Sequence, residues 1–341
     1  MGSAPLAPTP DEAARLRATL GAFTLTRVPS EEAAVWRVES AAGVWWLKAH
    51  LHANKAEREA AVYARLAALA PLGGAPLPFG VPRLLGRPSA RALLLSDLGG
   101  APLEASALRA PPLLRALGAA LGAWHLLPCE DLDPLSPLKA LQRRWGGLLE
   151  GLARAEAGAR LAALAGAGAG DLDGALREGL AGLRDGLAAL EREGGRRWWG
   201  PAGARALERR LCHRDVRPEN LRLLTPSAPG APALGLLDFG QARPDLWCAD
   251  WVTLYAPLRA RRDARGDAPD WREAWGAYRA ARTLSDEGAA EAERLLRVAA
   301  CAHALGTAAW ALRHADAAVA RRGAEELRAL SWALRDAASI C

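Results

Sequence analysis

Two carboxylates and a carboxamide occur in the second half of the chain at a spacing that suits chemistry on phosphates. Residues 211–221 read LCHRDVRPENL, which places Asp215 and Asn220 in a His-x-Asp-x-x-x-x-Asn pattern, and Asp238 follows the apolar run LGLL. Apolar runs on either side of a turn-rich segment predict a hairpin with these three side chains at its ends. Phosphoryl transfer needs one carboxylate to orient an attacking hydroxyl and oxygen ligands for the magnesium that bridges the phosphates. The alternative interpretation is a polar loop capped by Asp and Asn.

A cation for the phosphates is present in the first third of the chain. Lys48 ends the run WWLK and is one of three lysines. The helix predicted after it, over residues 54–70, has an apolar stripe that continues back through Glu59 at helical spacing, whereas Glu57 falls on the other face. An inward carboxylate is costly unless it is paired, so we expect an ion pair between Glu59 and Lys48. The alternative is that Glu59 only stabilises the dipole of its own helix.

Strands are predicted on both sides of this lysine. Alternating side chains predict a hairpin over 34–39 and 44–50, and two more strands over 81–86 and 92–98. The rest of the chain is mostly helical from residue 111 onward. Helix ends are predicted near residues 127, 152, 164, 190 and 211. A hairpin near 221–238 interrupts these helices, and more helices complete the chain.

Composition and charge exclude several classes of protein. The chain has 341 residues, of which 51% are hydrophobic and 24% charged, so it is globular and long enough for two domains or lobes. The net charge of +6 is dispersed among acids, and we expect no nucleic-acid partner. Neither a signal peptide, a lipidation signal nor a membrane-spanning segment is recognisable, so we expect a cytoplasmic protein without a membrane partner. Five cysteines without a C-x-x-C pair argue against a zinc site or a disulfide framework.

The motifs together resemble a known family. Lys48, Glu59, LLLSDLGG at 93–100, HRDVRPEN and LDFG are similar in order and spacing to the protein-kinase-like fold, specifically its aminoglycoside phosphotransferase and choline kinase superfamily. The resemblance covers roughly residues 20–255 and implies an α+β, two-lobed fold. An N-terminal nucleotide-binding lobe, 1–98, would hold a small antiparallel sheet and one helix, and a larger, mostly helical C-terminal lobe, 99–341, would follow.

The C-terminal lobe is expected to carry the catalytic machinery. The resemblance implies a catalytic loop over 211–221, a metal-binding hairpin over 221–240 and a helical acceptor-binding region over 129–200 and 245–335. Asp215 looks like the catalytic base, and Asn220 and Asp238 look like the ligands of Mg²⁺. Arg217 has a planar fork that suits the oxygens of the transferred phosphate. The alternative is that Arg217 is a surface side chain of the loop.

The N-terminal lobe is expected to bind ATP or GTP. Lys48 looks like the lysine that binds phosphate, with Glu59 as its partner, and Ser96 and Leu98 look like the hinge whose backbone holds the base. Trp46 lies on the same face of its strand as Lys48, where the resemblance implies an aromatic ring that stacks on the base. The alternative is that Trp46 fills the core of the lobe.

The acceptor is expected to be a small molecule. Only QARPDLWCA separates Gly240 from Asp250 and Trp251, which leaves no room for the activation segment on which a protein kinase docks a peptide. A flap over the phosphates would have to be built from VPSEEA, 28–33, which has no glycine. Residues 240–341 hold 14 acidic side chains against 15 arginines, which disfavours a polycationic antibiotic.

The resulting prediction is an ATP-dependent phosphotransferase that acts on a hydroxyl of a sugar, amino alcohol, amino acid or aminoglycoside-like molecule. The alternatives are an atypical protein kinase and a catalytically silent nucleotide-binding regulator. Tryptophans of the second half could stack on an acceptor, but packing is the more common role of a tryptophan. The candidates lie outside the regular helical stripes or at their edges and are Trp198, Trp199, Trp247, Trp251, Trp271 and Trp275.

Overall fold

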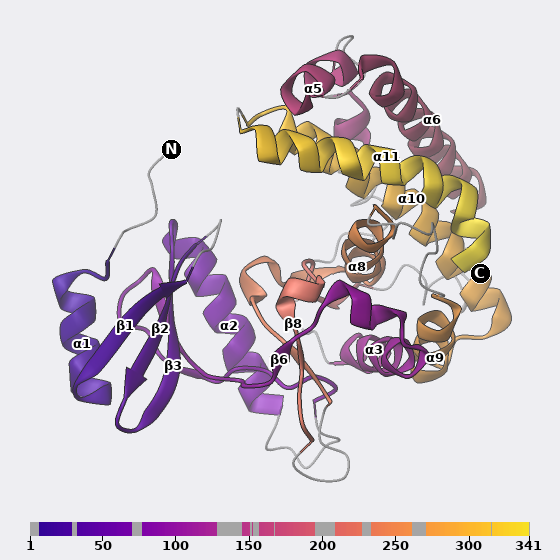
Figure 1. Ribbon diagram of the computed structural model, residues 1–341. Coiled ribbons are helices and arrows are strands. Elements are labelled where there is room, and N and C mark those ends of the chain that lie inside the picture. The colour runs from indigo at the N-terminus through magenta and orange to yellow at the C-terminus, as the bar shows by residue number, and fades with distance from the viewer. Residues whose placement is uncertain are drawn as a thin grey trace. The chain divides into compact units, whose positions relative to one another are not determined.

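The computed structural model describes most of the chain in two compact units (Figure 1). The described residues are 7–28, 33–69, 77–127, 145–150, 152, 157–166, 168–194, 209–226, 233–260, 271–314 and 316–340. The first unit comprises Met1–Leu103 and Glu219–Arg243, and the second comprises Glu104–Pro218 and Pro244–Cys341. Residues 29–32 of the expected flap, as well as Trp198 and Trp199, lie outside the described residues.

The first unit is built on a five-stranded antiparallel sheet of order β1-β2-β3-β5-β4. Its strands are β1 Phe23–Val28, β2 Ala33–Ser40, β3 Gly43–His50, β4 Leu84–Gly86 and β5 Ala92–Ser96. Two helices accompany the sheet, α1 Pro10–Leu20 and α2 Ala53–Leu69. The hairpin of β2 and β3, the strands β4 and β5, and the helix α2 confirm the elements predicted for this part of the chain.

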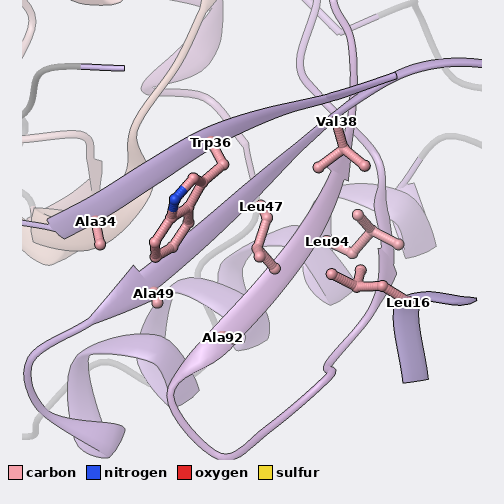
Figure 2. Packing of buried hydrophobic residues seen from close by; sticks show 8 residues of the cluster. All are labelled: Leu16, Ala34, Trp36, Val38, Leu47, Ala49, Ala92 and Leu94. Atoms are coloured by element: carbon pink, nitrogen blue, oxygen red, sulfur yellow. The ribbon is translucent and has the colours of Figure 1, made fainter. Parts of the chain in front are cut away.

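The two faces of the sheet have different partners because side chains alternate along each strand. Leu16 of α1 packs with residues of β2, β3 and β5 in a buried apolar cluster, which includes Leu47 (Figure 2). Trp46, Lys48 and His50 alternate with Leu47 along β3 and therefore face the other way. Helix α2 contacts β3, β4 and β5, and its Glu59 bonds to Lys48 and His50 on that second face.

A second sheet in this unit has the order β6-β8-β9, with β6 Ala101–Pro102, β8 Leu221–Leu223 and β9 Leu234–Leu236. Strands β8 and β9 form the predicted hairpin, with Leu221 opposite Leu236. Gly80 donates its N–H to Leu234 O at 2.8 Å and accepts from Leu236 N at 2.9 Å. The sequence prediction assigns this hairpin to the C-terminal lobe. In the structure it groups with the first 103 residues because of the β6 pairing and the Gly80 bridge.

The second unit is mostly helical. Helix α3 packs on α9, and α10 packs on α11 and α6 (Figure 1). The helix bounds are α3 Pro111–Trp124, α5 Ala157–Ala165, α6 Ala169–Gly194, α8 Cys248–Ala260, α9 Arg272–Arg282, α10 Asp286–Ala311 and α11 Ala317–Ile340. A two-stranded sheet pairs β7 Arg209–Cys212 with β10 Arg243–Leu246. No helix in the described part of the chain is long and apolar enough to cross a membrane.

Two local features differ from the sequence-based expectation. A helix end was expected near residue 211, but this segment is the strand β7, whose backbone pairs with the distant β10. Helix α1 was not predicted, although its start carries a capping box. Thr9 Oγ1 accepts from the Glu12 N–H at 3.3 Å, and Glu12 Oε2 accepts from the Thr9 N–H at 2.9 Å.

Candidate active site

The predicted ion pair between Lys48 and Glu59 is present. Lys48 Nζ lies 3.1 Å from Glu59 Oε1 and 2.9 Å from Glu59 Oε2, and both side chains are buried. Strand β3 places Lys48 on the face that α2 covers, and the apolar stripe of α2 turns Glu59 inward. The alternative interpretation, in which Glu59 only stabilises its helix dipole, is therefore wrong.

The electrostatics of this pair keep both groups charged. Burial on its own lowers the pKa of Lys48, but the carboxylates of Glu59 and Asp238 raise it above its ordinary value. Burial likewise raises the pKa of Glu59, but the charge of Lys48 and the hydrogen bond from His50 bring it below its ordinary value. An ammonium and a carboxylate thus persist in a buried position because each group compensates the desolvation of the other.

Asp238 is the second carboxylate on Lys48, with Oδ1 at 2.6 Å from Nζ. Its backbone is left-handed, with φ of 62°, which is uncommon for a residue other than glycine. The same Oδ1 accepts from the N–H of Gly240 at 3.2 Å, and the ring of Phe239 packs edge-on against Tyr63 of α2 with centroids 5.2 Å apart. These contacts hold Asp238 at the end of β9, with 43% of its side chain exposed.

Asn220 lies across the hairpin from Leu237, the residue that precedes Asp238. The N–H of Leu237 donates to the carbonyl of Asn220 at 2.9 Å, and the register of β8 and β9 continues to this point. Both side chains remain partly exposed. A carboxylate and a carboxamide offer the oxygen ligands that Mg²⁺ prefers, and the exposed fraction leaves room for waters and phosphate oxygens. The donor set therefore fits a magnesium site.

Asp215 and Arg217 lie together in the second unit. Arg217 Nε is 2.7 Å from Asp215 Oδ1, and Arg217 Nη2 donates to Oδ2 at 2.8 Å. The guanidinium therefore contacts both oxygens of the carboxylate, with a hydrogen bond from Nη2. The structure thus places the guanidinium on the carboxylate that the sequence predicts as the base.

The loop before Asp215 is held by Asp250 of α8. Asp250 accepts the backbone N–H groups of His213 at 3.0 Å and Arg214 at 2.5 Å, and it is fully buried. Arg214 has a φ of 64°, a strained conformation that these bonds maintain. His125, at the end of α3, lies 3.1 Å from Asp250 through Nε2. The loop geometry therefore depends on a buried network that spans α3 and α8.

Sequence reasoning missed His125, whose ring is held from both sides. Burial lowers the pKa of His125, and the ring is therefore neutral at pH 7. Since Nε2 donates to Asp250, Nδ1 accepts from the hydroxyl of Tyr278 at 2.9 Å, and Arg282 donates to that hydroxyl at 3.1 Å. Potential ligand atoms of His125, Cys212 and Asp250 lie within 4.8 Å of one another. Because hydrogen bonds already occupy all three side chains, the cluster positions the loop rather than a metal.

The residues expected at the base-binding end are gathered around β5. Trp46 is partly buried, lies outside the apolar cluster of the sheet, and donates its indole N–H to Asp97 Oδ1 at 2.9 Å. The Ser96 hydroxyl accepts from the N–H of Arg83 at 2.8 Å. The side chain of Leu98 lies against Gly80 and Gly235, where added Cβ atoms would meet it at 3.3 Å and 2.5 Å. Leu98 therefore contacts the β8–β9 hairpin through its side chain.

Four of the six candidate tryptophans are described, and all four pack in the interior of the second unit, which confirms the packing interpretation for them. Each of these side chains is at most 3% exposed. The rings of Trp275 and Tyr278 stack with centroids 5.4 Å apart, and Trp251 meets Tyr278 edge-on at 5.2 Å. The four residues are Trp247, Trp251, Trp271 and Trp275.

A buried acid on α11 was also missed. Glu326 is 5% exposed, and its Oε2 has no hydrogen-bond partner among the described residues. Burial raises the pKa of Glu326 to about 7, against the opposing charges of Arg322 and Arg217. A glutamate in an amphipathic helix gives no sequence signal for this, because its burial depends on the helices that pack around α11.

Comparison with known proteins identifies the class. A family model described as the phosphotransferase enzyme family matches residues 24–284, so the chain belongs to this family. The comparison with curated proteins found no match. The family membership confirms the resemblance predicted from Lys48, Glu59 and the HRDVRPEN and LDFG motifs.

Solved structures of low sequence identity share the fold. A choline kinase from Cryptosporidium parvum Iowa II has a TM-score of 0.63 at 11% identity, with 95% of each chain covered. A microcompartment-associated aminopropanol kinase has a TM-score of 0.60 at 18% identity and covers 96% of this chain and 98% of its own. A spectinomycin phosphotransferase in complex with ADP and spectinomycin has a TM-score of 0.56 at 10% identity, with 96% of each chain covered. These likenesses confirm the predicted α+β, protein-kinase-like fold.

Proposed function

We propose that the protein is an ATP-dependent kinase that transfers the γ-phosphoryl group to a hydroxyl of a small molecule. The observation that carries the proposal is the buried Lys48–Glu59 pair with Asp238 on the same ammonium. A charged lysine held by one buried and one partly exposed carboxylate is suited to bind phosphate when the exposed carboxylate takes a metal instead. A spectinomycin phosphotransferase of this fold forms a complex with ADP, which supports a nucleotide-dependent enzyme.

Each polar residue then has a role. Lys48 binds the nucleotide phosphates, Glu59 holds Lys48, and Asn220 and Asp238 hold Mg²⁺. When bound, the ion neutralises charge on the phosphates. The backbone of the segment with Ser96 and Leu98 holds the base, and Trp46 stacks on it.

Asp215 orients the acceptor hydroxyl and accepts its proton as the phosphoryl group is transferred. Arg217, whose guanidinium contacts both carboxylate oxygens of Asp215, supplies a positive charge beside the transferred phosphoryl group. The backbone bonds from His213 and Arg214 to Asp250 fix the loop that carries both residues. This fixed loop favours a positioned base over a silent regulator.

The acceptor class is proposed from both the chain and its relatives. The relatives named above are kinases of choline, aminopropanol and spectinomycin, each of which carries hydroxyl groups. Among the classes expected from the sequence, amino alcohols, sugars and amino acids are therefore the first to test, followed by aminoglycosides.

A screen of acceptor pools tests the proposal. ATP consumption with magnesium would be measured across pools of these four classes, and phosphorylated products would be identified by mass. We expect one pool to give a product, and the Asp215→Asn variant to lose turnover by orders of magnitude while its ATP affinity stays near that of the wild type. A variant that keeps most of the wild-type rate on the true acceptor would contradict the role of Asp215.

A further inference from the structure

His50 is a buried histidine that shares Glu59 with Lys48. It ends β3 two residues after Lys48, so both side chains lie on the face that α2 covers. Its Nε2 lies 2.6 Å from Glu59 Oε2, and the side chain is 3% exposed. The backbone N–H of His50 donates to Arg91 O at 2.9 Å, which fixes the ring's attachment point on the sheet.

The direction of this hydrogen bond follows from the state of Glu59. The pKa of Glu59 lies below its ordinary value because Lys48 and His50 outweigh the effect of burial, so its carboxylate is ionised at neutral pH. An ionised carboxylate only accepts hydrogen bonds. The proton of the ring therefore sits on Nε2, and His50 donates to Oε2.

Glu59 needs this second donor because Lys48 is shared. Lys48 Nζ lies between Glu59 and Asp238, at 2.9 Å and 2.6 Å from their nearest oxygens. A lysine that also binds phosphate has still fewer N–H groups for Glu59, since an ammonium has three. The Tyr63 hydroxyl also donates to Glu59 Oε1, but only at 3.5 Å, so without His50 the fully buried carboxylate would be under-satisfied.

His50 also contacts the backbone that follows Asp238. A Cβ added to Gly240 would lie 3.4 Å from His50 Cε1 and 3.5 Å from Glu59 Oε2. The imidazole is thus packed between Glu59 and the turn that carries Asp238.

We infer that His50 is a positioning residue of the proposed kinase, which fixes the rotamer of Glu59 and thereby holds the Lys48 ammonium where nucleotide phosphate binds. The inference rests on the proposed function. His50 does not touch the nucleotide in this arrangement, and its effect passes through Glu59.

The test compares two substitutions of His50 in the full-length chain. His50→Leu removes the donor at similar volume, and His50→Gln keeps an N–H of comparable reach. We expect His50→Leu to weaken the affinity for magnesium ATP about tenfold, the scale seen when a group that orients a ligand-binding residue is removed, and His50→Gln to restore it to within about threefold. The exposed His52→Leu is the matched control and should bind as the wild type does. Affinities are measured by calorimetry on protein shown to be folded by circular dichroism.

A double-mutant cycle distinguishes positioning from general packing. In a Glu59→Gln background, His50→Leu should have no further effect on ATP affinity, because the group through which His50 acts has lost its charge. An equal loss in both backgrounds, or a His50→Leu protein that binds ATP like the wild type, would overturn the inference and leave the proposed function standing. A wild-type protein that fails to bind magnesium ATP would overturn the proposed function itself.

Discussion

Trp46 and Trp36 lie on neighbouring strands of the same sheet but on different faces. Trp36 is 3% exposed and belongs to the apolar cluster with Leu16 and Leu47, whereas Trp46 lies outside that cluster and bonds to Asp97. Trp46→Ala should therefore lower stability by only about 1 kcal/mol, the scale of one hydrogen bond. It should weaken ATP and GTP alike by roughly fivefold, because a stacked indole contributes ~1 kcal/mol beyond its buried area.

Trp36→Ala serves as the control for Trp46→Ala. It should lower stability by the ~3 to 5 kcal/mol typical of a buried tryptophan. Urea unfolding measures the stabilities, and calorimetry measures the affinities. If Trp46→Ala loses as much stability as Trp36→Ala and its folded fraction binds nucleotide normally, Trp46 is a packing residue.

Glu326 gives the protein a predictable pH dependence of stability. Its pKa is raised to about 7 by burial, so the folded state holds the proton more tightly than the unfolded chain does. The tighter proton binding stabilises the folded state. This stabilisation is fully present below the pKa of the unfolded chain, near 4.5, and is lost as the pH rises through about 7. Arg322, Arg217 and Glu325 are the charged groups that act on it.

Glu326→Gln should remove the loss of folding stability that the wild type shows as the pH rises. Relative to the wild type, the variant should gain about 3 kcal/mol of stability between about pH 4 and about pH 8, since each pH unit between two pKa values corresponds to about 1.4 kcal/mol. Unfolding midpoints in urea across this pH range measure the effect. A difference between variant and wild type that does not change with pH would show that the pKa of Glu326 is the same in the folded and the unfolded chain.

Contacts between individual side chains were predictable from the sequence only where a local sequence pattern indicated them. Glu59 was predictable because it continues an apolar stripe of its own helix, next to a strand that ends in Lys48. His50 and His125 were not, because their partners Glu59 and Asp250 are identified only after the strand and helices have packed. The contact of Arg217 with Asp215 likewise became visible only with the side-chain positions.

At the scale of elements, α3 and α9 approach each other closely through glycines. A Cβ on Gly118 would overlap the carbonyl oxygen of Ala274, and one on Gly122 would lie 2.6 Å from the Cβ of Ala281. Gly118→Ala should therefore destabilise the protein by about 1 to 3 kcal/mol through overpacking against backbone. Thermal or urea unfolding measures this change.

Gly276→Ala, on the exposed side of α9, is the matched control. A Cβ there meets no described atom within 4 Å, so the substitution should stabilise the helix by about 0.5 to 1 kcal/mol. Equal effects of the two substitutions would contradict the close approach of α3 and α9. This approach also fixes Tyr278 beside His125, since one lies on α9 and the other follows α3.

Elements were predictable where the periodicity was clear. Alternation in β2 and β3 and the stripe of α2 were sufficient for these three elements. The strand β7, RRLC, is too short to show a period and is stabilised by pairing with β10, which is distant in sequence. Helix α1 has a capping box in its sequence, Thr9 to Glu12, which is the signal that could have identified it.

At the scale of the whole molecule, the fold is shared with kinases at 10 to 18% identity. Such conservation of fold without sequence is expected when a few polar residues and many interchangeable apolar ones define the structure. The motifs HRDVRPEN and LDFG were therefore sufficient to predict the family. The boundary between the lobes was harder to predict from the sequence, because the hairpin of β8 and β9 groups with the first unit through its bridge to Gly80.

The central claim is that Lys48, Glu59 and Asp238 bind the phosphates of a magnesium nucleotide. It is tested most directly by titrating ATP into the wild type and Asp238→Ala, with magnesium and with a chelator, and with Asp286→Ala as a surface control. Asp238→Ala should lose affinity only when magnesium is present, because the carboxylate contacts the ion and not the phosphate. In the chelator its affinity should match or exceed that of the wild type, since Lys48 is released from a competing carboxylate. An equal loss in magnesium and in chelator, or no loss in either, would contradict the account.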